Sequence, residues 1–275
     1  MGIASLLRSL LKKNAHKTND EVEEDMYGFY RRIESQSRVK KNYLNDKVRL
    51  VLVDWLIEVH TELGFAPETL FLAVNIADRF LSAVVVPWSE LQLVCTAALV
   101  IACKYEEEWF PSSVEFLYIP QTYFTCLFDA SFSQEKINSM EKKILNKLGW
   151  KIMVPTIHSF LVEILASSDC GDTNQLLKNM AFYLGELAMS DYATTTTYSP
   201  SMIAASTIYA ARSCILKQSH GWEKALQKTG YSKRQLACCA KLLLQLAKMT
   251  KHGMPERKVF EKYSDSTWDA VALIP

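Results

Sequence analysis

The chain has 275 residues, of which 49% are apolar and 22% charged, and a formal net charge of +1. This is the composition of ordinary globular domains, and the length allows two compact units, which argues against disorder along the whole chain. A charge near zero gives no large field for phosphate backbones, and we find no basic run beyond pairs such as Arg31-Arg32, so nucleic-acid binding is not expected.

The first stretch in chain order is MGIASLLRSLLKK, which places apolar residues on one helical face opposite Arg8, Lys12 and Lys13. Such a segment is either a terminal docking helix or a helix that lies on a membrane surface. Leu6 stands where the myristoylation pattern requires serine or threonine, so that lipid anchor is not expected.

Beyond this stretch, apolar residues recur at helical spacing almost everywhere, and strand-like alternation is absent. The sequence therefore predicts an all-α fold. Three serines have a glutamine or glutamate three residues later, the spacing of a helix-capping box. These pairs are Ser89 with Gln92, Ser112 with Glu115, and Ser232 with Gln235. The expected helices cover 20–36, 46–63, 67–84, 89–106, 112–118, 133–148, 155–167, 172–191, 199–216, 221–228, 232–250 and 255–263.

These helices suggest two bundles of about five helices each, that is, tandem repeats of one fold. TAALVIACKY in the first half and IAASTIYAAR in the second are rich in small residues, which let neighbouring helices approach closely, so each is expected to be central in its bundle. A glycine and a proline in GWKIMVPT mark the link between the halves. The expected division is a tail at 1–19, a first bundle with its preceding helix at 20–153, a second bundle at 154–263 and a tail at 264–275.

Two charges interrupt apolar stripes in the first bundle. Arg49 continues the stripe that runs through Leu52, and Asp78 lies four residues after Val74 and three before Leu81. Because an isolated buried charge costs far more than a buried pair, Arg49 and Asp78 are predicted to be partners in a structural role.

Lys104 and Glu141 are similar anomalies. Lys104 follows Ile101 by three residues at the end of its helix, and Glu141 follows Ile137 by four. Lys104 could cap its own helix by donating hydrogen bonds to the last carbonyls. Alternatively, it could donate to carbonyls of another chain or be solvated. The acidic run at 106–108 is unfavourable at a negative helix end and is either a solvated loop or a contact for a positively charged partner.

The seven cysteines are scattered and never have CxxC spacing, which argues against a structural zinc site and indicates a reducing compartment. We expect a protein of the nucleus and cytoplasm with no cofactor and no metal. The longest apolar run, 91–103, is shorter than the roughly 20 residues of a bilayer span, so no membrane-spanning segment is expected, and no membrane is expected among the partners. With no phosphate-binding glycine loop, no nucleophile motif and no histidine ligand spacing, an enzyme is not expected either.

Several segments together resemble the cyclin family. VRLVLVDWLIEVH, ETLFLAVNIADRFLS and LQLVCTAALVIACKYEEEWFP are similar to three successive helices of the cyclin box. EDMYGFYRRIESQSRV resembles the start of plant mitotic B-type cyclins, and the similarity continues through SMEKKILNKLGWKIMVPT to VFEKYS. It covers roughly residues 20–264 and implies two five-helix cyclin folds preceded by an N-terminal helix.

The resemblance also implies a function. Cyclins of this sort are non-catalytic subunits that bind and activate a cyclin-dependent serine/threonine kinase, help to recruit its substrates, and control passage from G2 into mitosis. In the family, the lysine that matches Lys104 bonds carbonyls near the end of the kinase's regulatory helix, and the glutamate that matches Glu141 accepts from its other backbone groups. Phe110, Phe116 and Tyr118 could cover apolar kinase surface, with core positions as the alternative.

Two further sets of residues match family features. Arg49 and Asp78 match a buried ion pair. A docking patch for RxL-type substrate proteins is matched by Val48, Val51, Trp55, Glu58, Leu91 and Gln92. Val48 replaces the usual methionine of this patch, and Trp55, in the middle of a helix, has a core position as its alternative.

Some features depart from the family pattern. The segment 37–46 is shorter than usual and the loop 120–133 is longer, and both flank the expected kinase-binding face. The RxxL of Arg8 and Leu11 resembles the start of a destruction box read by the ubiquitin-ligase machinery, but His16 stands where asparagine is typical. Two alternatives stay open: a degenerate cyclin-fold scaffold that binds partners without activating a kinase, and a nucleic-acid binder of the transcription-factor-IIB type.

Overall fold

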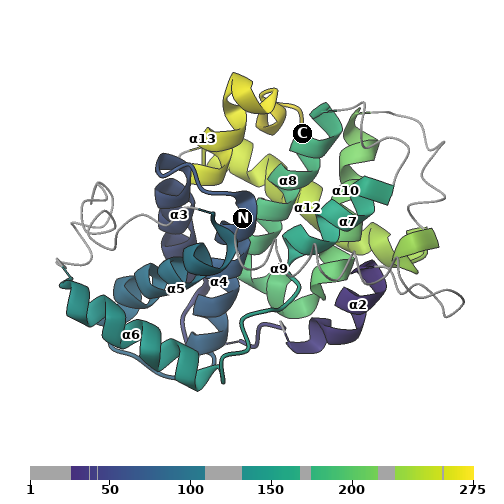
Figure 1. Ribbon diagram of the computed structural model, residues 1–275. Helices are drawn as coiled ribbons and strands as arrows, with labels where there is room; N and C mark the ends of the chain where they lie inside the picture. The colour runs from purple at the N-terminus through teal and green to yellow at the C-terminus, as the bar shows by residue number, and fades with distance from the viewer. Residues whose placement is uncertain are drawn as a thin grey trace, which may run out of the picture. The chain divides into compact units, whose positions relative to one another are not determined.

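The computed structural model describes residues 26–36, 38–41, 43–108, 132–167, 175–215, 227–255 and 257–275. Within these ranges the regular structure is entirely helical, which confirms the predicted fold class (Figure 1). The chain forms two compact units. Unit 1 contains the described part of Val39–Val154, and unit 2 contains that of Glu24–Arg38 together with Pro155–Pro275.

Unit 1 is a helical bundle around a central helix. Its elements are α3 (Asp46–Glu62), α4 (Pro67–Leu81), η2 (Trp88–Glu90), α5 (Leu91–Glu106) and α6 (Gln134–Lys147). Every residue from Leu91 to Cys103 is buried, and α5 packs against α3, α4 and α6 (Figure 1). The small alanines of TAALVIACKY allow this close approach, as predicted.

Most helices of unit 1 begin where the sequence indicates. The side chain of Asn45 caps α3 by accepting from the Val48 N–H at 2.9 Å, and Pro67 is the first residue of α4. The capping box expected at Ser89 is wrong: residues Trp88–Glu90 form a 3-10 turn, and α5 begins at Leu91 without a side-chain cap. The 3-10 turn already satisfies the first amide of the helix, because the Leu91 N–H donates to the Trp88 carbonyl.

The acidic run at 106–108 contains a cap for another helix. The N-cap residue of α4, Ala66, provides no side-chain hydrogen bond. Instead Glu107, just beyond the end of α5, accepts from the Ala66 N–H at 2.8 Å and from the Thr69 hydroxyl. A carboxylate at a helix N-terminus is favourable, so Glu107 is neither simply solvated nor reserved for a partner.

Unit 2 is a second bundle. Its helices are α2 (Met26–Ile33), α7 (Ile157–Ser167), α8 (Gln175–Ser190), α9 (Tyr192–Thr197), α10 (Pro200–Ile215), α12 (Lys233–Gly253) and α13 (Lys258–Ser264), with 3-10 turns η1 (Glu34–Gln36), η4 (Ser266–Trp268) and η5 (Val271–Leu273). The small-residue helix α10 packs against α7, α8, α9 and α12, which gives it the central place predicted for IAASTIYAAR. The predicted capping box of Ser232 and Gln235 is present at the start of α12.

Other local predictions have different outcomes. The sequence did not predict α9, because its YATTTT composition has low helix propensity; the Asp191 carboxylate supplies a cap by accepting from the Thr194 N–H at 2.8 Å. Gly149 ends α6 as expected, with a left-handed φ of 61°. The expected helix at 112–118 and most of the one at 221–228 lie outside the described residues.

The helix that precedes the first bundle belongs to unit 2. Tyr27 and Tyr30 of α2 are buried, and their rings meet Phe160 of α7 edge to face, at centroid distances of 5.4 and 5.8 Å. The Tyr27 hydroxyl donates to the Thr229 carbonyl at 3.3 Å. This grouping differs from the expected domain at 20–153, because the aromatic contacts of α2 join residues far apart in the sequence.

Candidate functional site

The candidate site in unit 1 is an ion pair between α5 and α6. The Lys104 ammonium donates to both carboxylate oxygens of Glu141, at 2.9 and 2.8 Å. The Lys104 side chain is 46% exposed, whereas the Glu141 side chain is 11% exposed. The pair therefore presents a cation at the surface above a carboxylate that is largely withdrawn from water.

The sequence explains the position of each partner. On α6, the buried residues Ile137, Met140 and Ile144 share a face with Glu141, as the helical spacing predicts. On α5, Lys104 directly follows the buried run that ends at Cys103, so its side chain emerges where the helix reaches solvent. The sequence did not indicate that the two charges bind each other, because they are 37 residues apart and on separate helices.

The other three residues expected at this face lie outside the described residues: Phe110, Phe116 and Tyr118. Arg8 and Leu11 of the RxxL motif, which were expected to serve degradation, lie outside them too. The described part of the short segment 37–46 is held to the residues that follow α4: Ser82 donates to the Lys40 carbonyl at 2.6 Å, and the Tyr43 hydroxyl donates to the Val86 carbonyl at 3.0 Å.

Arg49 and Asp78 form a bidentate ion pair in the core of unit 1. The Arg49 Nε and Nη2 groups donate to the two carboxylate oxygens of Asp78 at 2.9 and 2.7 Å. The residues are only 2% and 4% exposed. Beside them, burial, followed by the charge of Asp78, raises the pKa of Cys95 to about 12, so this thiol stays protonated as a small core group. The burial of the ion pair is what the predicted structural role requires.

The structure divides the six residues expected to form the substrate-docking patch. Val51 is 38% exposed, and Val48 and Glu58 are partly exposed on the same helix. Trp55, Leu91 and Gln92 are buried, at 5%, 0% and 6% exposure. The burial of Trp55 supports its alternative interpretation as a core residue. The part of the patch open to a ligand in the free chain is therefore the α3 surface of Val48, Val51 and Glu58.

Unit 2 contains a buried charge cluster that the sequence did not indicate. Glu186 of α8 accepts from the Lys262 ammonium at 2.6 Å and from the Tyr263 hydroxyl at 2.8 Å. The side chains of Glu186 and Lys262 are 1% and 5% exposed. Burial, followed by the charge of Glu186, raises the pKa of Tyr263, so its hydroxyl remains a donor. The sequence feature that could have indicated this cluster is Glu186 itself, a carboxylate within a helix that is buried on nearly all sides.

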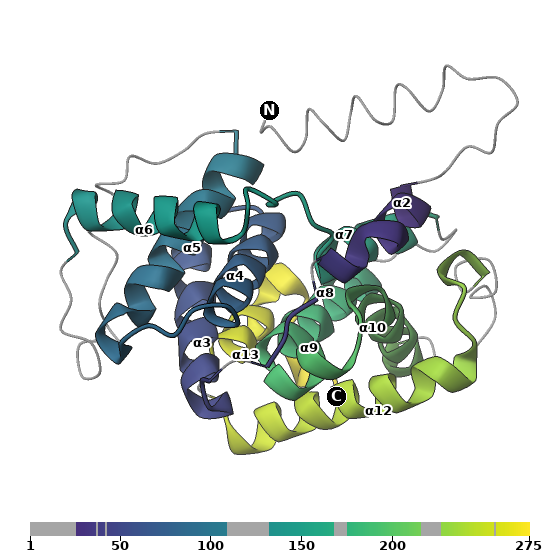
Figure 2. The ribbon, with the colours of Figure 1, turned by 90° about the horizontal axis from the view of Figure 1, so that it is seen from below.

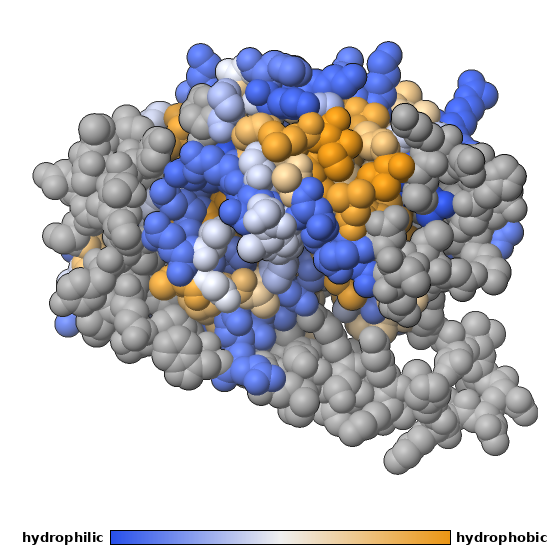
Figure 3. Space-filling view, turned by 90° about the horizontal axis from the view of Figure 1, so that it is seen from above, coloured by the Kyte–Doolittle hydropathy of each residue, from blue (hydrophilic) through white to orange (hydrophobic). Residues whose placement is uncertain are grey.

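Unit 2 also has a local basic face, which does not show as a basic run in the sequence because its residues are seven positions apart. Arg234, Lys241 and Lys248 recur every seven residues on α12, they are exposed, and the helix contains no aspartate or glutamate. Figure 2 shows α12 lying along the outer side of unit 2. The net charge of +1 conceals this concentration of positive charge. On the face seen in Figure 3, apolar surface gathers mainly in one area, with hydrophilic residues above and below it in the view.

The described part of the chain contains neither a metal-binding cluster of side chains nor a membrane-crossing helix. Within it, no group of three or more histidine, cysteine, aspartate or glutamate side chains is arranged to hold a metal ion. None of its helices combines the length and the apolar content that a membrane crossing needs.

Comparison with known families decides the identity of the fold. The cyclin N-terminal domain matches residues 25–153, and the cyclin C-terminal domain matches residues 155–275. The chain belongs to the cyclin family. The matched residues include both partners of each ion pair described above, so the buried pairs and the surface pair all lie within the two cyclin domains.

This cyclin is similar to plant proteins of one class. It is 43% identical over 261 residues to the G2/mitotic-specific cyclin S13-6 of Glycine max, covering 93% of this chain and 54% of that protein. It is 42% identical over 257 residues to S13-7 of the same plant, covering 91% of this chain and 95% of that protein. The chain thus spans about half the length of the first relative and nearly all of the second.

A solved structure shows the same fold at low sequence identity. The viral cyclin from herpesvirus saimiri superposes with a TM-score of 0.61 at 16% identity, covering 86% of this cyclin and 95% of that chain. The tandem helical architecture is therefore kept where most side chains differ.

Proposed function

We propose that this cyclin is a non-catalytic regulatory subunit that binds and activates a cyclin-dependent serine/threonine kinase at the passage from G2 into mitosis. The observation that carries the proposal is the Lys104–Glu141 pair, with its ammonium half-exposed and its carboxylate largely buried. The similarity to G2/mitotic-specific cyclins supports the choice of kinase class and cell-cycle stage.

The pair has the donors and acceptors that binding to a helix end requires. Lys104 can donate to carbonyls at the end of a partner helix while Glu141 accepts from backbone N–H groups. In the free chain Lys104 can turn to solvent, because its side chain is 46% exposed, whereas Glu141 needs a new donor as soon as the mutual contact opens. Hydrogen bonds to charged groups contribute about 1.5–3 kcal/mol each once water is excluded, so the exchange of partners is favourable.

Activation follows from selective binding. A protein kinase is active when its strand lysine pairs with the glutamate of its mobile helix. A partner that binds only the inward position of that helix shifts the kinase toward the active state in proportion to its differential affinity. The cyclin therefore needs a rigid binding face and no catalytic group of its own.

The test is the phosphorylation rate of a basic, proline-directed peptide by a mitotic cyclin-dependent kinase phosphorylated on its activation loop, titrated with this protein. We expect a saturable rise. The double variant Lys104→Ala/Glu141→Ala should need at least about tenfold more protein for half-maximal stimulation, the equivalent of 1.4 kcal/mol of binding. Its melting temperature should change little, because neither charge is left without a partner.

A matched control removes another surface ion pair. Lys258 and Glu261 lie 2.9 Å apart on α13, and Lys258→Ala/Glu261→Ala makes the same change in charge. This control should stimulate the kinase like the unsubstituted chain. Equal loss in both variants would argue against the proposed face, and no stimulation at saturating protein would favour the scaffold that binds without activating.

We further propose that RxL-type substrate proteins dock on the α3 surface of Val48, Val51 and Glu58. Val51 offers apolar contact at 38% exposure, and Glu58 offers a negative charge for a basic residue of the docked segment. Val51→Lys should raise KM about tenfold for an RxL-bearing substrate and leave KM unchanged for a short peptide without that motif. An equal rise for both substrates would contradict docking at this surface.

Two remaining parts of the proposal depend on the sequence. The RxxL of Arg8 and Leu11 supports the ubiquitin-ligase machinery as a further proposed partner, which would remove the protein. The scattered cysteines, none of them in CxxC spacing, support a proposed location in the nucleus and cytoplasm.

A further inference from the structure

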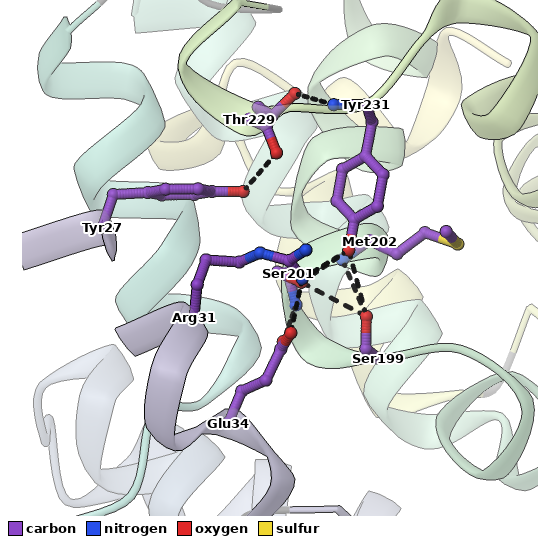
Figure 4. Close-up of polar contacts among 8 residues, drawn as sticks. All are labelled: Tyr27, Arg31, Glu34, Ser199, Ser201, Met202, Thr229 and Tyr231. Atoms are coloured by element: carbon purple, nitrogen blue, oxygen red, sulfur yellow. Dashed lines mark hydrogen bonds and ion pairs between the residues drawn. The ribbon is translucent and has the colours of Figure 1, made fainter. Parts of the chain in front are cut away.

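A polar network in unit 2 joins the start of α10 to α2 (Figure 4). The Arg31 guanidinium of α2 donates from Nη1 to the Ser201 hydroxyl and to the Tyr231 hydroxyl, each at 2.6 Å, and also pairs with Glu34. Glu34 in turn accepts from the Ser201 N–H at 3.3 Å. One arginine thus connects α2 with the first turn of α10 and with the segment that precedes α12.

Ser199 lies at the edge of this network. Its hydroxyl is 3.2 Å from the Ser201 hydroxyl and 3.4 Å from the Tyr231 hydroxyl, and it accepts from the Met202 N–H at 3.4 Å (Figure 4). All three contacts are long and between neutral groups, so they are weak. The Ser199 hydroxyl is therefore next to the arginine-bound groups without being needed to hold them.

The sequence around Ser199 is distinctive within the chain. Of the eight prolines, only Pro200 follows a serine or threonine, so Ser199-Pro200 is the one Ser/Thr-Pro dipeptide. It lies in the link between the end of α9 at Thr197 and the start of α10. Tyr198 has an extended backbone with φ −105° and ψ 149°, and residues 198–200 are partly exposed. A residue before proline also favours the extended conformation.

We propose that Ser199 is a phosphorylation site for a proline-directed serine/threonine kinase and that Arg31 holds the phosphate. In the reaction, the Ser199 hydroxyl loses its proton and its oxygen bonds to the γ-phosphorus of a nucleoside triphosphate. The bond from that phosphorus to the bridging oxygen breaks, and a nucleoside diphosphate leaves. The products are phosphoserine, the diphosphate and the released proton.

The surroundings favour the phosphorylated state. A phosphoserine carries a charge of about −1.5 to −2 and three strong acceptor oxygens. At Ser199 it would stand at the N-terminus of the 16-residue helix α10, where negative charge is favourable, and one hydroxyl away from the Arg31 guanidinium.

Glu34 is the opposing charge in this environment. Its carboxylate already accepts hydrogen bonds from Arg31 and from the Ser201 N–H, and its negative charge would repel a phosphate. The phosphate carries more charge than a carboxylate and is attached to the helix start, so it replaces Glu34 as the anion bound by Arg31. The result is a stronger connection of α2 to α10.

The first experiment measures modification of the folded full chain. The chain is incubated with ATP and an activated mitogen-activated protein kinase, which is proline-directed and acts without this cyclin. Intact-mass and peptide mass spectrometry should show one phosphate, at Ser199, that is absent in Ser199→Ala. If the folded chain takes up none while a peptide of residues 193–206 is fully phosphorylated, the site is closed and the proposal is overturned.

The second experiment tests the role of Arg31. Phosphorylation should raise the melting temperature of the unsubstituted chain by about 2–4 °C. The rise should disappear in Arg31→Gln and persist in Arg32→Gln, a matched change at the neighbouring position; Arg31→Lys, which keeps the charge, should retain part of it. A fall on phosphorylation, or an equal rise in Arg31→Gln, would show that Arg31 does not hold the phosphate.

This inference is independent of the proposed kinase activation. The modifying kinase needs no cyclin, so phosphorylation of Ser199 is measured whether or not the chain stimulates a cyclin-dependent kinase. Ser199 lies in unit 2, and the Lys104–Glu141 pair lies in unit 1, so their variants test separate sites.

Discussion

Asp78→Ala is expected to lower the free energy of unfolding of unit 1 by about 3–5 kcal/mol, as for other broken buried ion pairs. The variant leaves the Arg49 guanidinium 2% exposed, opposite a methyl group instead of a carboxylate. Two charge-assisted hydrogen bonds of 2.9 and 2.7 Å are lost, and the carboxylate that balances the guanidinium charge in the core is lost with them. This is a large part of a total stability of about 5–15 kcal/mol.

Urea denaturation of the Asp78 variant measures this effect. A control, Glu62→Ala, removes an exposed carboxylate at the end of α3 and should leave the midpoint within experimental error. A second control, Arg49→Met/Asp78→Leu, removes both charges and should recover most of the loss, because an apolar pair of similar volume needs no charge partner. A wild-type midpoint for Asp78→Ala would mean that Arg49 is solvated in solution.

Lys262→Met is expected to destabilise unit 2 to a similar degree, about 3–5 kcal/mol. The substitution removes the ammonium 2.6 Å from the Glu186 carboxylate, whose side chain is 1% exposed. The Tyr263 hydroxyl still donates to Glu186, but a neutral donor cannot balance a buried negative charge. Lys262 also lies over the rings of Tyr263 and Trp268, at 5.1 and 5.3 Å, so a cation–π contribution is lost as well.

Because Lys262 is on α13, its loss should act first on the C-terminal segment. Hydrogen exchange should speed up at residues 258–264 before it does so in α10, since α13 is joined to α8 through this pair. The double variant Glu186→Gln/Lys262→Met removes both charges and should regain stability relative to Lys262→Met alone. Unchanged exchange in Lys262→Met would contradict a structural role for the pair.

Local patterns accounted for most of the helices and for one ion pair. Apolar spacing predicted α3 and α4 to within a few residues, and Ser232 with Gln235 marked the start of α12. The same spacing placed Arg49 and Asp78 on buried faces, which left each as the natural partner of the other. These features depend on neighbours within two helical turns, so the sequence carries them directly.

Local sequence patterns did not predict the contacts between segments that are far apart in the chain. Nothing local pairs Lys104 with Glu141, or connects Glu107 to the start of α4 across 41 residues. Likewise, Tyr27 and Tyr30 indicate an amphipathic helix but not that it joins unit 2 through Phe160.

The sequence by itself determined the all-α class, the tandem cyclin domains and which charges lie on apolar faces, because these depend on helical periodicity and recognisable local segments. Only the tertiary structure decided how the charges are partnered. In the packed structure Trp55 is buried and Lys104 is half-exposed. Arg31 lies beside the first turn of α10, next to Ser199-Pro200. The physical reason is that a charge or an aromatic ring binds whatever the packed helices bring within a few ångströms, and that distance is set by helix packing, not by separation along the chain.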